Sequence, residues 1–314
     1  MRSKYIFIAF FVLTGFIAKA QQDVQFSDYK LNISSFNPAF AGYFDSSVLL
    51  IYRTQFAGIE GAPKSQNLNV NLPVNDKMGL SFNAINETLG VTDEFSLTGD
   101  YSYSIFVDDF SVISFGLKAG VNVLNVDYTR LTMDDETDPS FMNNIENKVS
   151  PRLGVGVLFN TPDWYIGVST PNFIEESYNP TVVGSTASSK PHIYAMTGYQ
   201  MSVSNELIFK PSVLAKAVSG APFAIDLAAN FDYAEKFRFG ASYRWDSAVT
   251  AIVGVSFWDN MQAGYAYDYN ISDLGTYAPS SHQFYLKYTI KKMSKYRRQR
   301  CACSFSDSSS DLEF

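Results

Sequence analysis

Residues Glu94 to Phe106, EFSLTGDYSYSIF, alternate between two kinds of side chain from Phe95 to Ile105. Apart from Gly99, every second position holds Phe, Leu, Tyr or Ile, and the positions between them hold Ser, Thr or Asp. A period of two predicts a β-strand, because successive side chains of a strand point to opposite faces. One face of this strand is therefore apolar, and the other is small and polar.

The same alternation recurs along the chain and predicts about fourteen strands of about nine to twelve residues, long enough to cross a bilayer at barrel tilt. An even number of strands is also what a closed bacterial barrel requires when both termini lie on one side. The strands are expected to begin near Ser47, Ser65, Lys77, Glu94, Ser111, Ser150, Trp164, His192, Leu207, Phe223, Phe237, Ala248, Met261 and Ser281.

The links between these strands alternate in length, as in outer-membrane barrels with short periplasmic turns and long outer loops. Short links are expected at 73–76, 107–110, 161–163, 204–206, 234–236 and 259–260. Longer links are expected at 57–64, 87–93, 127–149, 171–191, 218–222 and 270–280, and the link at 246–248 is short where the alternation predicts a long one.

Aromatic residues gather at the predicted strand ends. Trp164 and Trp258 adjoin short links, whereas Trp245, Tyr269 and Tyr128 lie at the opposite ends, as the interfacial girdles of a membrane barrel do. The sequence thus predicts an all-β fold, a transmembrane antiparallel β-barrel of about fourteen strands. The alternative is a large soluble β-sandwich whose apolar faces meet.

The composition argues against several functional classes. The chain has 314 residues, 46% hydrophobic and 16% aromatic, with a formal net charge of −7. An acidic balance makes nucleic acid an unsuitable partner. With 2 His and 2 Cys there is little material for a metal site, and Cys301 and Cys303, one residue apart, do not have zinc-site spacing. We therefore expect no cofactor and no metal.

The first twenty residues have the layout of a signal peptide. Arg2 and Lys4 precede an apolar run at 5–17, and Ala18-Lys19-Ala20 follows it. Such a peptide would export the chain, and cleavage after Ala20 would leave Gln21 as the N-terminus. With the barrel strands, export predicts a location in the outer membrane. A spanning helix is the alternative, but the run is only about thirteen residues where about twenty are needed.

The remaining chain divides into three predicted parts. Residues 21–46 are polar and broken by Pro38 and Gly42, so this N-terminal segment is expected to lie across the periplasmic mouth or to enter the lumen as a plug. Residues 47–290 would form the barrel. Residues 291–314 carry a basic run and then a Ser-rich acidic end, which is typical of a solvated, disordered periplasmic tail.

If the apolar faces contact lipid, a set of charged and polar side chains points into the lumen, and cations outnumber carboxylates among them. One interpretation is structural, because a lumen without apolar packing is normally filled by charge and hydrogen-bond ladders. The other is an anion-attracting pore or a docking cavity for a polar peptide. The predicted lumen residues are Arg53, Gln55, Asp100, Lys118, Arg152, Lys210, Lys216, Asp226, Arg238, Arg244, Asp268 and Lys287.

Catalysis has little support in the sequence. A surface lipase needs a Ser, a His and a carboxylate or amide, and only His192 and His282 could serve as the base. Ser281 next to His282 is the lipase hypothesis, but no nucleophile-elbow glycines surround it. We therefore predict that the protein is not an enzyme.

Three short motifs carry a resemblance to a known family. They are Asn37-Pro38-Ala39-Phe40-Ala41-Gly42, Tyr52-Arg53-Thr54-Gln55-Phe56 and Gly61-Ala62-Pro63-Lys64-Ser65. The chain resembles the PorP/SprF family of Bacteroidota outer-membrane proteins, whose patterns are similar to NPAYAG, YRNQW and GAPKTQ, with Phe40, Thr54 and Phe56 as mild departures. The tail after the last strand also departs from the family, which typically ends near that strand.

The resemblance implies a non-enzymatic barrel of the type IX secretion system that supports export or surface anchoring of secreted proteins, such as gliding adhesins. Its implied partners are outer-membrane lipid, other secretion components and the secreted cargo. A FadL-like transport porin for hydrophobic or anionic solutes is the alternative function. The run from Asn37 to Gly42 is expected to form a fixed turn that seats the N-terminal segment at the barrel mouth, because Pro38 fixes φ and Gly42 permits positive φ.

Overall fold

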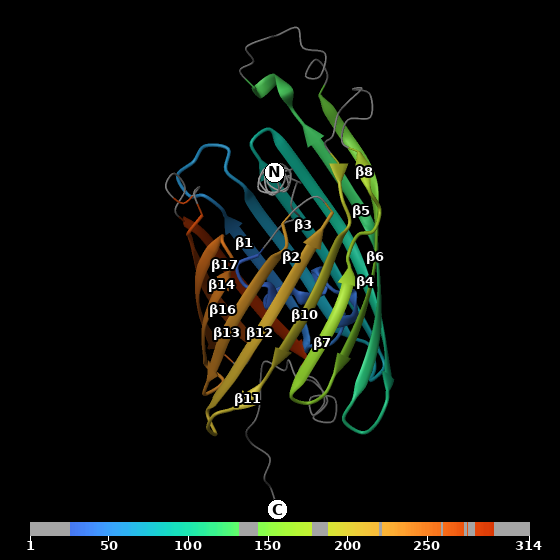
Figure 1. Ribbon diagram of the computed structural model, residues 1–314, viewed down its shortest axis with the longest axis vertical. Coiled ribbons are helices and arrows are strands. Elements are labelled where there is room, and N and C mark those ends of the chain that lie inside the picture. Colours follow the sequence, from blue (N-terminus) through green and yellow to red (C-terminus); the bar gives the residue numbers. More distant parts are fainter. Residues whose placement is uncertain are drawn as a thin grey trace, which may run out of the picture.

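A computed structural model describes residues 26–131, 144–177, 188–219, 222–258, 260–272, 275 and 280–291. In this part of the chain one antiparallel sheet closes on itself as a barrel (Figure 1), through the β1–β17 and β10–β12 pairings. Its fourteen long strands are β1 (Ser46–Thr54), β2 (Lys64–Pro73), β3 (Met78–Leu89), β4 (Thr92–Phe106), β5 (Val112–Val126), β6 (Ile145–Asn160), β7 (Trp164–Thr170), β10 (His192–Tyr199), β12 (Leu207–Val218), β13 (Ala224–Tyr233), β14 (Phe237–Arg244), β15 (Ala248–Phe257), β16 (Met261–Asn270) and β17 (Ser280–Lys291). The predicted fold class is confirmed.

Three further strands are only two residues long. Strands β8 (Glu176–Ser177) and β9 (Ser188–Ser189) pair with each other within the link between β7 and β10. Strand β11 (Met201–Ser202) pairs with β12 beyond the end of β10. The described helices are also short: η1 (Tyr29–Ser35), η2 (Pro38–Phe40) and η3 (Tyr128–Arg130). Within the described ranges, none of them is long and apolar enough to cross a bilayer.

The barrel strands begin within two residues of their predicted positions, except β6. Strand β6 starts five residues earlier, at Ile145, because an irregularity opposite Leu124 and Val126 lets the ladder with β5 continue. The predicted long link at 87–93 is wrong. Strands β3 and β4 pair up to Leu89 and Thr92, and Gly90 at φ 59° supplies the positive φ that this tight turn needs.

The apolar face of the strands is the outer face of the barrel. Leu97, Phe115 and Phe82 keep 47–48% of their surface exposed, whereas Ser81 and Asp100 between them are buried. A soluble sandwich would bury these apolar side chains against a second sheet, so that alternative is wrong. The strand-end tryptophans Trp245 and Trp258 are the most exposed of the three, at 65% and 79%.

The turn between β4 and β5 shows how the short links are made. The Asp108 carboxylate accepts hydrogen bonds from the backbone N–H groups of Phe110 and Ser111, at 2.7 and 2.6 Å. These bonds, with the one from Phe110 first, lower the pKa of Asp108 below its usual value. Asp in such positions mimics part of the backbone turn.

The first described residues lie inside the barrel. Helices η1 and η2, blue in Figure 1, lie within the ring of strands, and most residues from Phe26 to Tyr43 are buried. The predicted signal peptide at 1–20 lies outside the described residues. So does the predicted tail, except for Lys291.

Candidate functional site: the occupied lumen

Residues 26–45, which we call the luminal segment, pack against an apolar cluster inside the barrel. Their side chains Phe26, Tyr29, Ile33, Phe36 and Phe40 are at most 5% exposed. The wall supplies inward-facing apolar partners to this cluster, namely Leu49, Ile51, Leu158, Tyr165, Tyr194, Met196, Leu214 and Tyr285. The luminal segment therefore brings a hydrophobic core into the barrel, in addition to the polar contacts of the wall.

The run from Asn37 to Gly42 forms a tight turn around η2. The Asn37 side chain accepts a hydrogen bond from the Ala39 N–H at 2.9 Å, which caps η2, and it donates one to the Val157 carbonyl of β6 at 3.2 Å. Pro38 occupies the first position of η2, where its missing N–H costs nothing. Gly42 adopts φ 62° and donates its N–H to Asn71 Oδ1 at 2.8 Å.

Inward-facing glycines make room for this turn. A side-chain carbon at Gly116 of β5 would overlap the backbone of Pro38 and Ala39, and one at Gly79 of β3 would overlap that of Ala41. Ser102 of β4 donates a hydrogen bond to the Ala41 carbonyl at 2.6 Å. The structure thus places the turn within the barrel, directly against its wall.

The dual role of the Asn37 amide gives a first prediction. We expect Asn37→Asp to destabilise the barrel by about 2 kcal/mol, because the variant keeps the cap but places a carboxylate against the Val157 carbonyl in a fully buried position. Thermal unfolding in detergent would measure the loss. Asn75→Asp is the control, since Asn75 lies exposed in a turn where its Oδ1 accepts from the N–H groups of Lys77 and Met78. Equal losses in the two variants would contradict the assignment.

Ion pairs line the lumen, and they include carboxylates that the sequence analysis did not place there. The pairs, with their N–O distances, are Arg53–Asp268 at 2.6 Å, Lys118–Asp100 at 2.9 Å, Arg152–Glu94 at 2.9 Å, Lys210–Asp232 at 2.8 Å, Arg244–Asp226 at 2.8 Å and Arg238–Asp28 at 3.7 Å. Asp28, Glu94 and Asp232 are the additional partners. The expected excess of cations is therefore largely compensated.

Two further predicted lumen cations lie on the inner wall. Lys216 of β12 is 8% exposed. Lys287 of β17 lies with its Nζ 6.0 Å from the centre of the Phe44 ring. Gln55 does not lie on a strand; it follows β1, and its backbone N–H donates to the Pro63 carbonyl at 2.9 Å.

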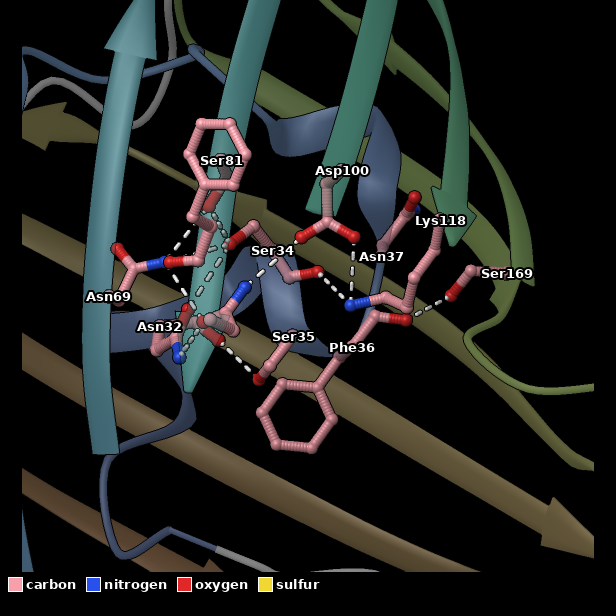
Figure 2. Close-up of polar contacts among 12 residues, drawn as sticks. Asn32, Ser34, Ser35, Phe36, Asn37, Asn69, Ser81, Asp100, Lys118 and Ser169 are labelled. Carbon is pink, nitrogen blue, oxygen red and sulfur yellow. Dashed lines mark hydrogen bonds and ion pairs between the residues drawn. The ribbon is translucent and has the colours of Figure 1, made fainter. Parts of the chain in front are cut away.

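A polar network joins the luminal segment to β2–β5 (Figure 2). Asn32 donates to Asn67 and Asn83, at 2.9 and 2.7 Å, and Asn83 in turn donates to Asp100 at 3.1 Å. Figure 2 shows Lys118 between the Asp100 carboxylate and the Ser34 carbonyl, which its Nζ reaches at 3.3 Å. The wall and the segment thus satisfy each other's buried polar groups.

The three family motifs lie in different places. The first motif lies against the lumen wall with Asn37, Pro38, Ala39 and Gly42. Arg53 of β1 is part of that wall and points into the lumen. Tyr52, next to Arg53, points outward and is 42% exposed. Gly61, Ala62 and Pro63 lie in the link before β2, where Gly61 adopts φ 73°, and Lys64 begins β2. Of the motif residues, the first motif and Arg53 therefore lie in the lumen, and Arg53 contacts Ser27 and Asp268 there.

The lipase hypothesis has no matching geometry. Ser281 is buried and faces inward, whereas its neighbour His282 faces outward and shares a 2.6 Å hydrogen bond with Tyr265 through Nδ1. Adjacent strand residues point to opposite faces, so the two side chains do not form a dyad. His192 is buried on the inner wall. Within the described ranges, no group of His, Cys, Asp or Glu side chains could hold a metal ion.

One sequence signal could have revealed the occupied lumen. Gly79, Gly116, Gly156 and Gly167 all fall on the polar phase of their strands, where a barrel filled by its own side chains would carry larger residues. Their positions indicate the close approach of another backbone. No feature of the sequence indicated that Asp28 lies in the lumen, because its partner Arg238 is far away along the chain.

The barrel is similar to solved outer-membrane structures. The outer membrane protein Omp33 of Acinetobacter baumannii is 8% identical, with a TM-score of 0.45, covering 79% of this chain and 98% of that one. A FadL homologue of Pseudomonas aeruginosa is 12% identical, with a TM-score of 0.46, covering 82% of this chain and 93% of that one. No curated protein matches the chain in sequence.

A family match covers most of the chain. The family model described as "Type IX secretion system membrane protein PorP/SprF" matches residues 18–288. This range includes the luminal segment and nearly the whole barrel. A closed antiparallel barrel agrees with a family of membrane proteins. The chain belongs to the PorP/SprF family of type IX secretion system membrane proteins.

Proposed function

We propose that this protein is a non-enzymatic barrel that supports the export or surface anchoring of particular secreted proteins, such as gliding adhesins. The observation that carries the proposal is the occupied lumen in a member of a secretion family. A barrel whose interior is packed by its own N-terminal segment is suited to act as a docking partner in an assembly. Other type IX components and the secreted cargo are its partners in this proposal.

The proposal includes the processing of the chain. Residues 1–20 would act as a signal peptide, and Gln21 would become the N-terminus before the luminal segment enters the barrel. Residues 21–46 would then serve as the plug, 47–290 as the membrane barrel and 291–314 as a periplasmic tail. Mass spectrometry of the protein from its native membrane would test the predicted cleavage site.

Co-purification tests the proposed function. The native protein would be extracted from its outer membrane in mild detergent, beside an unrelated barrel from the same membrane as control. We expect secretion components or a large secreted protein to accompany it and to be absent from the control. A solitary barrel would contradict the proposal.

The alternative, a FadL-like porin, predicts a different result. A transport porin should pass solute or current as isolated from the membrane, whereas the occupied lumen leads us to expect a silent barrel. Conductance of the purified protein in a planar bilayer separates the two functions. Steady conductance of the unaltered protein would favour the porin.

A further inference from the structure

The luminal segment consists of two parts that touch opposite walls of the barrel. Residues 33–45, which we call the anchor, bond to β2–β7: Asn71, Ser102, Lys118, Val157 and Ser169 supply the contacts. Residues 26–31, which we call the arm, bond to β1, β12, β14, β16 and β17 instead. The segment therefore crosses the lumen from one wall to the other.

Four residues hold the arm, and Ser27 makes the most contacts, including a hydrogen bond that it accepts from Arg53. Ser27 bonds to Gln283 and Asp268, both at 2.9 Å. Tyr29 donates to Ser212 at 2.8 Å, and Lys30 donates to the Lys210 carbonyl at 2.9 Å. Asp28 faces Arg238 at 3.7 Å, which is longer than a hydrogen bond, so their attraction is coulombic.

The anchor is held differently. Its backbone is seated against wall glycines that accept no larger side chain, and its carbonyls and N–H groups bond directly to the wall. The two parts meet at Asn32, whose φ of −130° and ψ of 62° interrupt η1. Asn32 itself is fixed to Asn67 and Asn83. Asn32 is thus the point at which the chain passes from the arm to the anchor.

The wall beneath the arm is unevenly charged. Strands β1 and β12–β17 direct six basic and three acidic described side chains inward: Arg53, Lys210, Lys216, Arg238, Arg244 and Lys287 against Asp226, Asp232 and Asp268. The arm adds one acid, Asp28, and one base, Lys30, so its departure leaves this excess unchanged. Rings of basic side chains favour the passage of anions.

Barrel width decides whether a passage can exist there. Eight-stranded barrels are filled by their own side chains, whereas barrels of about sixteen strands leave an aqueous channel. A barrel of fourteen strands has a lumen that wall side chains alone do not fill, and here the luminal segment completes the packing. Removing the arm takes Phe26 and Tyr29 out of the buried cluster that fills the lumen.

We propose that the arm, residues 26–31, is a latch that closes an anion-conducting passage along β12–β17, and that the anchor remains seated when the latch opens. In the isolated barrel the latch is closed, because Phe26 and Tyr29 are buried and the arm contacts are all formed. This inference goes beyond the proposed function and does not depend on any cargo. The ligand class is the small inorganic or organic anion.

Planar-bilayer recording of the purified full-length protein tests the latch. The first variant, Asp28→Lys, places a cation next to Arg238. The other variant replaces residues 26–31 with a Gly/Ser stretch of equal length. We expect the unaltered protein to be nearly silent and both variants to conduct at least about tenfold more, with a reversal potential that favours chloride over potassium. Asp163→Lys, with the same charge change in an exposed short link, is the control and should stay silent.

Selectivity supplies an independent readout. Adding Lys216→Glu to the Gly/Ser variant changes the wall to five basic and four acidic side chains, so the reversal potential should move toward that of potassium. Where Asp28→Lys fails to fold, Asp28→Asn serves instead, because its amide oxygen still caps the Lys30 N–H. Silent arm variants in a folded barrel, or a passage that prefers cations, would overturn the proposal. Co-purification of cargo tests the proposed function separately.

Discussion

Gly116→Val is expected to expel the luminal segment from its seat and to destabilise the barrel by about 3 kcal/mol, at the upper end of what overpacking costs. The new side chain would occupy the space of the Pro38 and Ala39 backbone, which cannot move away as a flexible side chain can. Thermal unfolding in detergent would measure the loss of stability. Limited proteolysis should in addition cut the segment near residues 36–45 in the variant only.

A glycine on the opposite face is the matched control. Gly99 of β4 lies on the outer face, and a side-chain carbon there would meet the Phe82 ring at 3.6 Å, an ordinary contact distance. We expect Gly99→Val to change stability by less than about 0.5 kcal/mol, as surface substitutions usually do. Equal effects of the two variants would show that the interior glycines do not hold the segment.

Asp268→Ala is expected to cost about 3–5 kcal/mol, because it leaves the Arg53 guanidinium buried without its main carboxylate. The side chains of this pair are only 4% and 2% exposed. Asp268 also accepts hydrogen bonds from Ser27 and Thr250, both at 2.9 Å, so the variant loosens the arm as well as β1 and β15. Chemical unfolding of the refolded barrel in lipid vesicles would measure the difference.

A second ion pair in the same lumen provides the comparison. Arg152 and Glu94 are 2.9 Å apart but 22% and 24% exposed, so water screens their charges. We expect Glu94→Ala to cost about 1 kcal/mol or less. The double variant Arg53→Met with Asp268→Ala should recover much of the loss, because no buried charge then remains. If Glu94→Ala costs as much as Asp268→Ala, burial does not control the strength of these pairs.

The occupied lumen gives a physical account of the family motifs. Asn37, Pro38 and Gly42 shape a turn that lies against wall glycines, and Arg53 holds Asp268 beside the arm. In contrast, the motif residues Gly61, Ala62 and Pro63 lie in the link before β2. We therefore expect the first motif to hold the anchor in place, Arg53 to hold the arm, and the third motif to act elsewhere.

The amino-acid sequence by itself determined the strands and the faces of the wall. Alternation such as that from Glu94 to Phe106 depends only on neighbours along the chain, so strand positions, their number and the outward apolar face followed directly. Local pairing also explains the exceptions. The ladder between β3 and β4 extended to Leu89 and Thr92 because polar residues at strand ends pair as well as apolar ones.

Only the tertiary structure decided what fills the lumen. The contact of Ser27 with Asp268 joins residues 241 positions apart, and the approach of Ala39 to Gly116 likewise joins distant parts of the chain. Such contacts depend on closure of the barrel and on the path of the segment inside it. Neither of these produces a periodic pattern of residues in the sequence. Glycines on a polar strand face indicate that another backbone comes close but not which segment supplies it, so only the closed barrel shows what the face meets.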